Sequence, residues 1–186
     1  IFADVGNAAS RAGDIIARMR TLLRRGQVAL QPVDVKESLE ELLRLTRTDL
    51  IARGVSVTDL AIGDLPPVVS DRVQLQQILL NLIKNACDAM QANAADDRKL
   101  TITASVEQDE LRIGVLDCGV GLPGDVESLF QPFHSTKEGG LGMGLSICRM
   151  LVSAHGGRLW AEPRVEGGAA FYVALPLAAG AFSRDG

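Results

Sequence analysis

The sequence predicts an α+β fold: a two-layer α/β sandwich in which helices cover one face of a mixed sheet, preceded by a single coiled-coil-like helix. Three observations support this prediction. Helical periodicity alternates with segments of alternating polarity, two of these segments are close enough to form a hairpin, and the chain begins with a heptad pattern. With 186 residues, 47% hydrophobic and 23% charged, the chain can bury the core of one domain.

Composition excludes several classes of protein. A formal net charge of −4 gives no reason to expect a nucleic-acid partner, and charges interrupt every apolar stretch before it could span a membrane. The chain has an odd number of cysteines, Cys87, Cys118 and Cys148, and none of them form a C-x-x-C pair. We therefore expect no disulfide framework and no zinc site, and we expect a cytoplasmic location. No signal peptide is recognisable. Because the chain begins at Ile1 in helical sequence, we expect a fragment of a longer protein.

The heptad pattern occupies the start of the chain, where apolar residues are spaced alternately four and three apart. They are Ile1, Val5, Ala8, Ala12, Ile15, Met19 and Leu22. This spacing is typical of a helix that packs on another helix. Gly26 and Pro32 then interrupt it, so residues 1–30 are assigned to this helix, 31–178 to the globular domain and 179–186 to a tail.

Three more helices are expected in the globular domain. The first covers residues 35–53, with Leu39, Leu42, Leu43, Thr46 and Leu50 on one side, and ends at Gly54. Asp71 opens the second, which runs to about Ala92. Its predicted inner residues are Val73, Leu75, Ile78, Leu79, Leu82, Ile83 and Ala86. The third covers residues 145–155 and ends at Gly156.

Strands are expected between and after these helices. The alternating residues 55–60 predict one strand, and residues 100–107 and 110–116 predict two more, joined by a hairpin at Asp109-Glu110. A glycine-rich loop covers residues 117–142. Two closing strands are expected at residues 158–161 and 169–176.

The first group of polar residues lies on the second of these helices. Asn81, Lys84, Asn85 and Asp88 are spaced i, i+3, i+4 and i+7, so they project from one face. A carboxamide oxygen suits a Mg²⁺ that keeps water and phosphate oxygens as its other ligands, and Lys84 could neutralise phosphate charge. Taken alone, the same four residues are better explained as the ordinary polar outer face of a core helix.

The second group follows the strand expected at residues 110–116. A lone carboxylate at Asp117 can accept a hydrogen bond from an exocyclic amine such as that of adenine, and Gly119 and Gly121 let the backbone approach a base. The stretch also satisfies G-x-G-x-x-G. We reject a dinucleotide-binding loop, because Pro123 interrupts the turn and no helix follows directly.

The third group precedes the last helix. Gly140, Gly142 and Gly144 leave backbone N–H groups free to bind an anion at a helix N-terminus, although such loops are often plain turns. No Walker P-loop occurs. Thr136 and Lys137, just upstream, add a hydroxyl and a cation on an expected mobile lid.

Taken together and in order, these groups and Phe130-Gln131-Pro132-Phe133 resemble the N, G1, F and G2 boxes of histidine kinases. Residues 167–171 are similar to the final G3 box. The family belongs to a superfamily shared with gyrase, a heat-shock chaperone and mismatch-repair ATPases. The resemblance covers roughly residues 31–178 and implies a Bergerat-type ATP-binding fold. It is nearest to the nitrogen- and oxygen-responsive sensor kinases, and residues 1–30 resemble the second helix of the dimerisation and phosphotransfer hairpin.

The resemblance implies roles for individual residues. Asn85 would be the Mg²⁺ ligand, Asp117 the adenine-selecting carboxylate, and Asn81, Asn85 and Lys137 the catalytic residues. The implied ATP-binding residues are Asn81, Lys84, Asn85, Asp88, Asp117, Gly119, Gly121, Leu122, Phe133, Thr136, Lys137, Gly140, Leu141, Gly142, Met143, Gly144 and Leu145.

The chain departs from the histidine kinase pattern in two places. Ala170 stands where a threonine is usual, and Asp88 and Ala89 stand where many relatives have a basic and then an aromatic residue. Gyrase-like members carry a glutamate base where this chain has Asn81, which cannot accept a proton. Asn81 therefore argues against an autonomous ATPase and for phosphoryl transfer to another acceptor.

The implied activity is transfer of the ATP γ-phosphoryl group to a histidine of the hairpin, and then to an aspartate of a response regulator receiver domain. The implied cofactors are ATP and Mg²⁺, and the parent would be a homodimer through its hairpin helices. Only His134 and His155 are present, and both are interpreted as structural, so we do not expect this chain to phosphorylate itself. A non-catalytic nucleotide-binding scaffold and a serine kinase of the anti-sigma-factor type stay open as alternatives.

Overall fold

The computed structural model describes residues 29–62, 65–133 and 142–178. The heptad helix predicted at the start of the chain lies outside these ranges, as do the predicted lid residues Thr136, Lys137, Gly140 and Leu141. The division at residues 30 and 178 therefore stays a prediction.

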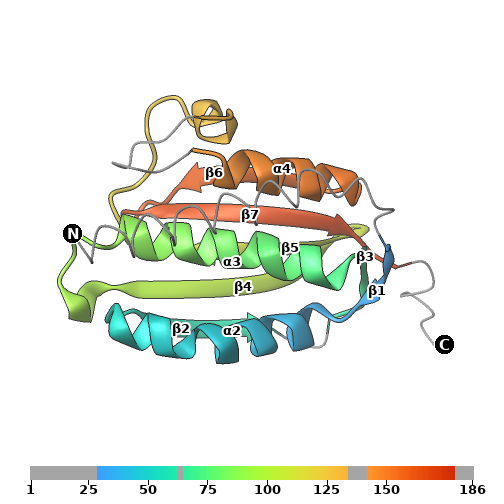
Figure 1. The fold of residues 1–186 in the computed structure, drawn as a ribbon, viewed down its shortest axis with the longest axis horizontal. Coiled ribbons are helices and arrows are strands. Elements are labelled where there is room, and N and C mark those ends of the chain that lie inside the picture. Colours follow the sequence, from blue (N-terminus) through green and yellow to red (C-terminus); the bar gives the residue numbers. More distant parts are fainter. Residues whose placement is uncertain (1–28, 63–64, 134–141, 179–186) are drawn as a thin grey trace, which may run out of the picture.

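A five-stranded mixed sheet forms one layer of the domain (Figure 1). Its strand order is β2-β4-β5-β7-β6; β2 pairs with β4 in parallel and the other neighbours are antiparallel. The strands are β2 (Ser56–Ile62), β4 (Lys99–Glu107), β5 (Glu110–Leu116), β6 (Arg158–Pro163) and β7 (Ala169–Pro176). The predicted hairpin joins β4 to β5, with Gln108 at φ 57° in its turn.

Three helices form the other layer and cover one face of the sheet (Figure 1). They are α2 (Val35–Ala52), α3 (Arg72–Ala89) and α4 (Gly144–Ala154). Asp71 is the N-cap of α3, since its carboxylate accepts hydrogen bonds from the N–H groups of Val73 and Gln74. The predicted α+β sandwich with a mixed sheet is confirmed.

The core lies between the two layers and is built from the periodic apolar residues. Its largest fully buried side chains are Leu39, Leu75, Ile78, Leu79, Leu82, Ile83, Met90, Leu100, Ile102, Leu111, Ile113 and Leu175. One prediction is wrong: Val73 is 70% exposed, because it lies in the first turn of α3 on the side away from the sheet.

Sequence reasoning missed a second, two-stranded sheet at one end of the domain. In it β1 (Gln31–Val33) pairs antiparallel with β3 (Val68–Ser70), and Val68 also bridges to Leu177 after β7. This small sheet therefore fastens the segment before α2 to the segment that follows β7.

Two short 3-10 helices were also not predicted. They are η1 (Ala95–Asp97), before β4, and η2 (Glu127–Phe130), in the loop that leads toward α4. Among the described helices, none has the length and apolar character needed to cross a bilayer.

Candidate functional site

Asp117 lies at the end of β5 and is almost completely buried, with 1% of its surface exposed. Its N–H donates to the carbonyl of Ala169 at 2.9 Å, and its Oδ1 accepts from the N–H groups of Gly119 at 2.8 Å and Ala169 at 3.3 Å. Its Oδ2 is buried and has no hydrogen-bond partner among the described residues. A buried acceptor without a donor is costly unless a ligand supplies one.

The charge state of Asp117 is set by opposing effects. Burial raises the pKa of its carboxyl above the ordinary value, and the N–H groups of Gly119 and Ala169 and the charge of Arg164 offset part of this rise. When ionised, the carboxylate is a pure acceptor, so its free Oδ2 can accept a hydrogen bond from an N–H or O–H group of a ligand.

Glycines keep the backbone around Asp117 close-packed. A Cβ at Gly119 would lie 2.5 Å from the carbonyl atoms of Ala89 at the end of α3, and a Cβ at Gly168 would overlap the carbonyl of Asp117. Gly168 also has φ +89°, a conformation that L side chains rarely adopt. The end of β5, the end of α3 and the β6–β7 turn therefore meet at Asp117.

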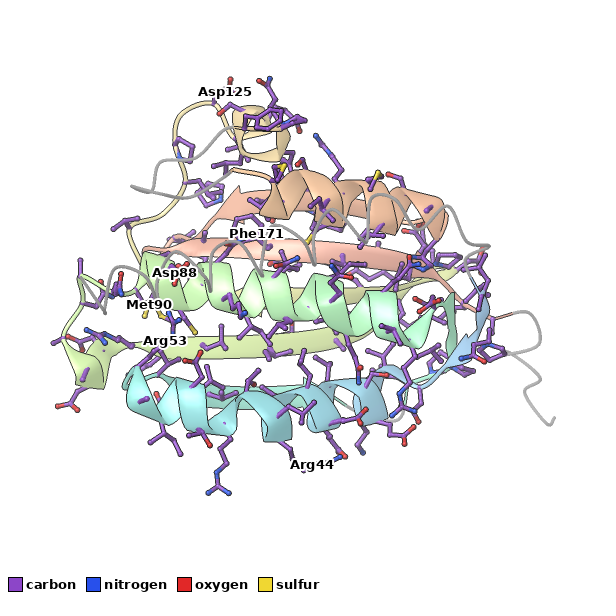
Figure 2. The ribbon with its side chains drawn as sticks, in the orientation of Figure 1. Arg44, Arg53, Asp88, Met90, Asp125 and Phe171 are labelled. Atoms are coloured by element: carbon purple, nitrogen blue, oxygen red, sulfur yellow. The ribbon has the colours of Figure 1, made fainter. Side chains whose placement is uncertain are left out.

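The four polar residues predicted on one helix face all lie on α3, but their surroundings differ. Asn81 and Asn85 are half-buried and Lys84 is exposed. Asp88 pairs with Arg53 at the end of α2, with 2.9 Å between its Oδ1 and Nη1 of Arg53 (Figure 2). The carboxylate of Asp88 therefore joins α2 to α3, and its predicted role in binding ATP stays a prediction.

The N-terminus of α4 carries the last described part of the predicted site. Gly142 has φ +62°, Met143 occupies the N-cap position without a side-chain hydrogen bond to the helix, and a Cβ at Gly144 would have no neighbour within 4 Å. The first N–H groups of α4 have no side-chain cap, and they can bind an anion. Met143 and Leu145 are half-buried and pack on the core, as does Leu122.

Phe133 precedes the predicted lid. It is 77% exposed and has φ 65°, an unusual conformation for an aromatic residue. An open groove of about 500 Å³ lies beside it, along the outer side of α4. Its lining residues are Phe130, Pro132, Phe133, Met143, Ser146, Ile147, Arg149, Met150 and Ser153.

Sequence reasoning missed Arg164 in the β6–β7 turn. Its Nη1 donates to the carbonyl oxygen of Asp117 at 2.8 Å, across 47 positions of sequence. Only the pair Gly167-Gly168 marks this turn in the sequence, and that signal points to the glycines and not to the arginine.

Residues 70–179 match the protein family described as histidine kinase-, DNA gyrase B- and HSP90-like ATPase. The chain is 38% identical over 170 residues to sensor histidine kinase TmoS of Ectopseudomonas mendocina, covering 90% of this chain and 18% of TmoS. It is 38% identical over 171 residues to sensor protein FixL of Bradyrhizobium diazoefficiens, covering 91% of this chain and 34% of FixL. The chain thus spans about a third or less of these relatives.

Solved structures agree with the fold. Full-length ShkA in complex with AMPPNP superposes with a TM-score of 0.77 at 28% identity, covering 92% of this chain and 36% of ShkA. Histidine kinase ThkA in complex with the response regulator TrrA superposes with a TM-score of 0.74 at 27% identity, covering 94% of this chain and 49% of that one. The chain therefore belongs to the histidine kinase-, DNA gyrase B- and HSP90-like ATPase family and is an ATP-binding catalytic domain of the sensor histidine kinase type.

Proposed function

We propose that this chain binds Mg·ATP and is the part of a sensor kinase that presents the γ-phosphoryl group to a histidine elsewhere in the parent protein. The observation that carries the proposal is the buried, unpartnered Oδ2 of Asp117 among close-packed glycines. A site of this kind selects its ligand strongly, because a nucleobase without an N–H donor at this position leaves the buried Oδ2 without a hydrogen bond.

In the proposed complex, Asp117 accepts a hydrogen bond from the adenine amine. Asn85 and Asn81, one turn apart on α3, have side chains suited to a hydrated magnesium ion. When bound, Mg²⁺ would offset the negative charge of the phosphates. The uncapped N–H groups that follow Gly142 at the start of α4 would hold phosphate oxygens.

The identity of residue 81 argues against rapid hydrolysis of ATP. Asn81 holds the position of the catalytic glutamate in gyrase-like ATPases, and its carboxamide takes up no proton at neutral pH. We therefore expect the chain to hold ATP for transfer and to hydrolyse it slowly. Thr136 and Lys137 would reach the phosphates from the lid, with Gly140 and Leu141, and these roles stay predictions.

The partners proposed are a response regulator receiver domain and a second copy of the parent protein. ThkA, a structural relative, is known in complex with the response regulator TrrA, which supports the first partner. Homodimerisation through the hairpin helices rests on the heptad pattern of residues 1–22. A cytoplasmic location belongs to the same proposal.

Calorimetric titration with ATP, ADP and GTP, with and without Mg²⁺, tests the proposal. We expect the chain to bind ATP and ADP in preference to GTP, and the Asp117→Asn variant to lose this preference. An Asn85→Ala variant should lose the effect of Mg²⁺ and keep the preference for adenine. Absence of ATP binding by the wild-type chain would reject the proposed function.

A further inference from the structure

Arg164 is held against Asp117 by its main chain and its side chain. Its Nη1 donates to the Asp117 carbonyl at 2.8 Å, and its Nη2 donates to Glu166 at 3.1 Å. Its own N–H donates to the carbonyl of Gly168 at 3.3 Å, and its carbonyl accepts from the N–H of Gly167 at 3.2 Å. The side chain is only 22% exposed. The guanidinium of Arg164 therefore has a fixed place beside Asp117, the residue proposed to bind the nucleobase.

The hydrogen bond goes to the main chain of Asp117 and not to its carboxylate. A guanidinium bound to Oδ2 would occupy the acceptor that a base needs. Here the positive charge lies next to the same residue while Oδ2 keeps no partner among the described residues. The positive charge of Arg164 can therefore act on Asp117 while Oδ2 stays available to a ligand.

The positive charge of Arg164 counteracts the effect of burial, which disfavours the ionised form of Asp117. Burial raises the pKa of Asp117 above its ordinary value, and the N–H groups of Gly119 and Ala169 and, to a smaller extent, the charge of Arg164 offset part of this rise. The surroundings of this carboxyl are the loop after β5, the start of β7, the end of α3 and the β6–β7 turn. Among the described residues of these elements, Arg164 is the charged group that influences Asp117, and Asp88 on α3 pairs with Arg53.

The protonation state of Asp117 decides which base fits. The ionised form offers only acceptors and matches the 6-amino group of adenine, whereas the protonated form offers an O–H donor and matches a 6-oxo group. We propose that Arg164 is a positioning residue for base selection, which fixes the main chain of Asp117 and keeps its carboxylate in the acceptor form that prefers a 6-aminopurine to a 6-oxopurine nucleotide. This inference rests on the proposed function.

The test compares ATP with inosine triphosphate, whose base carries a 6-oxo group. Both nucleotides have the same triphosphate, so phosphate titration cancels in the ratio of their Kd values. The ratio is measured by calorimetry with Mg²⁺ from about pH 5.5 to about pH 8 in the wild type, Arg164→Gln and Arg164→Lys. Gln keeps a hydrogen-bond donor without the charge, and Lys keeps the charge. Glu166→Gln is the matched control, because it removes the exposed partner of Arg164 and leaves its charge.

In Arg164→Gln we expect the preference for ATP to fall by more than about threefold at the acid end and to recover as the pH rises, because loss of the positive charge raises the pKa of Asp117. Arg164→Lys and Glu166→Gln should stay within about twofold of the wild type. A merely structural role would give a loss that is the same at every pH and that lysine does not restore.

Thermal unfolding without nucleotide verifies that each variant is folded. If Arg164→Gln is not, Arg164→Met replaces it, because methionine keeps the aliphatic stem without the charge. Intact ATP binding with an unchanged ratio in the uncharged variant would overturn the inference alone. Failure of the wild type to bind ATP would overturn the proposed function, and the inference with it.

Discussion

Arg98 donates a hydrogen bond of 2.6 Å from its Nη1 to the main-chain carbonyl of Arg53, and so joins the ends of two helices. Its Nη2 donates to the carbonyls of Gln91 and Asn93, which follow α3, and its Nε also donates to Asn93. The carbonyl of Arg98 in turn accepts from the N–H of Ser56 at the start of β2. One guanidinium thus bonds the carbonyl at the C-cap of α2 and two carbonyls of the segment that follows α3.

We expect Arg98→Ala to lower the free energy of unfolding by about 1–3 kcal/mol, because three main-chain carbonyls lose the same charged hydrogen-bond donor. Urea unfolding followed by circular dichroism measures this loss. Arg47→Ala is the control, since Arg47 is an exposed residue of α2, and it should change stability by less than about 0.5 kcal/mol. Equal losses in the two variants would contradict the proposed bridging of the helix ends.

Gly168→Ala should destabilise the fold by about 2 kcal/mol or more, because its Cβ would overlap the Asp117 carbonyl and its φ is +89°. ATP affinity should fall with it, since the same displacement moves the carboxylate. Gly124→Ala is the matched control: no atom lies within 4 Å of its added Cβ, and both stability and affinity should be unchanged. A Gly168→Ala variant as stable as the control would show that the β6–β7 turn packs less closely on Asp117.

Asp88 and Asn85 lie three residues apart on α3 but are expected to respond differently to substitution. Asn85→Ala should lose most of the Mg²⁺-dependent ATP affinity, whereas Asp88→Ala should change it by less than about threefold, because its carboxylate pairs with Arg53. Calorimetry of both variants makes the comparison. A loss in Asp88→Ala as large as that in Asn85→Ala would establish Asp88 as an ATP-binding residue.

The Arg53–Asp88 pair itself should contribute little to stability. Both side chains are about a third exposed, at 35% and 33%, so solvent screens their attraction. In a double-mutant cycle with alanine at each position, we expect a coupling below about 1 kcal/mol that decreases further in high salt. A larger coupling that salt does not change would mean that the pair is shielded from water.

His155, at the end of α4, should make stability depend on pH. The ring is 2% exposed, and its Nε2 accepts a hydrogen bond from the N–H of Asp71 at 3.2 Å. Burial lowers the pKa of His155, although the Leu151 carbonyl and the charge of Asp71 oppose this shift. The unfolded chain therefore binds a proton more readily, and stability should be lost as the pH falls through the ordinary histidine value of about 6.5 toward the lower folded value.

Urea unfolding at about pH 7.5 and at about pH 5.5 measures this loss in the wild type and in His155→Gln. The variant keeps an acceptor but does not titrate, so its stability should decline less over the same interval. Parallel declines in the two proteins would show that other groups cause the acid sensitivity.

Much of the fold was predictable because the chain repeats one pattern over several turns. The apolar spacing through Leu75, Leu79 and Leu82 identifies the buried side of α3, and these three residues are fully buried. The strands β1 and β3 were missed because three residues are too few to show a period. Val73 was assigned wrongly because the residues three and four positions after it are Gln76 and Gln77, so it does not share the helix face of Leu75.

The candidate site was predictable where its residues are neighbours in sequence, and it was not predictable where they meet only through tertiary contacts. Asp117 and its neighbouring glycines stand together in the sequence. Arg164 and Arg98 bond main-chain carbonyls, and any residue type can supply a carbonyl, so their partners leave no trace in sequence. The same holds for Asp88, whose helical face is evident but whose pairing with Arg53 is a tertiary contact.

The small sheet of β1 and β3 ties the segment before α2 to the strand that ends beside Asp117. Both β1 and Leu177 pair with β3 at one end of the domain, while β7 runs from there to Ala169 beside Asp117 at the other (Figure 1). Along its length β7 is hydrogen-bonded to β5 on one side and to β6 on the other. The main chain from β1 to the carboxylate of Asp117 is therefore one continuous network of hydrogen bonds, and a displacement of β1 from the sheet would have to break it at Val68.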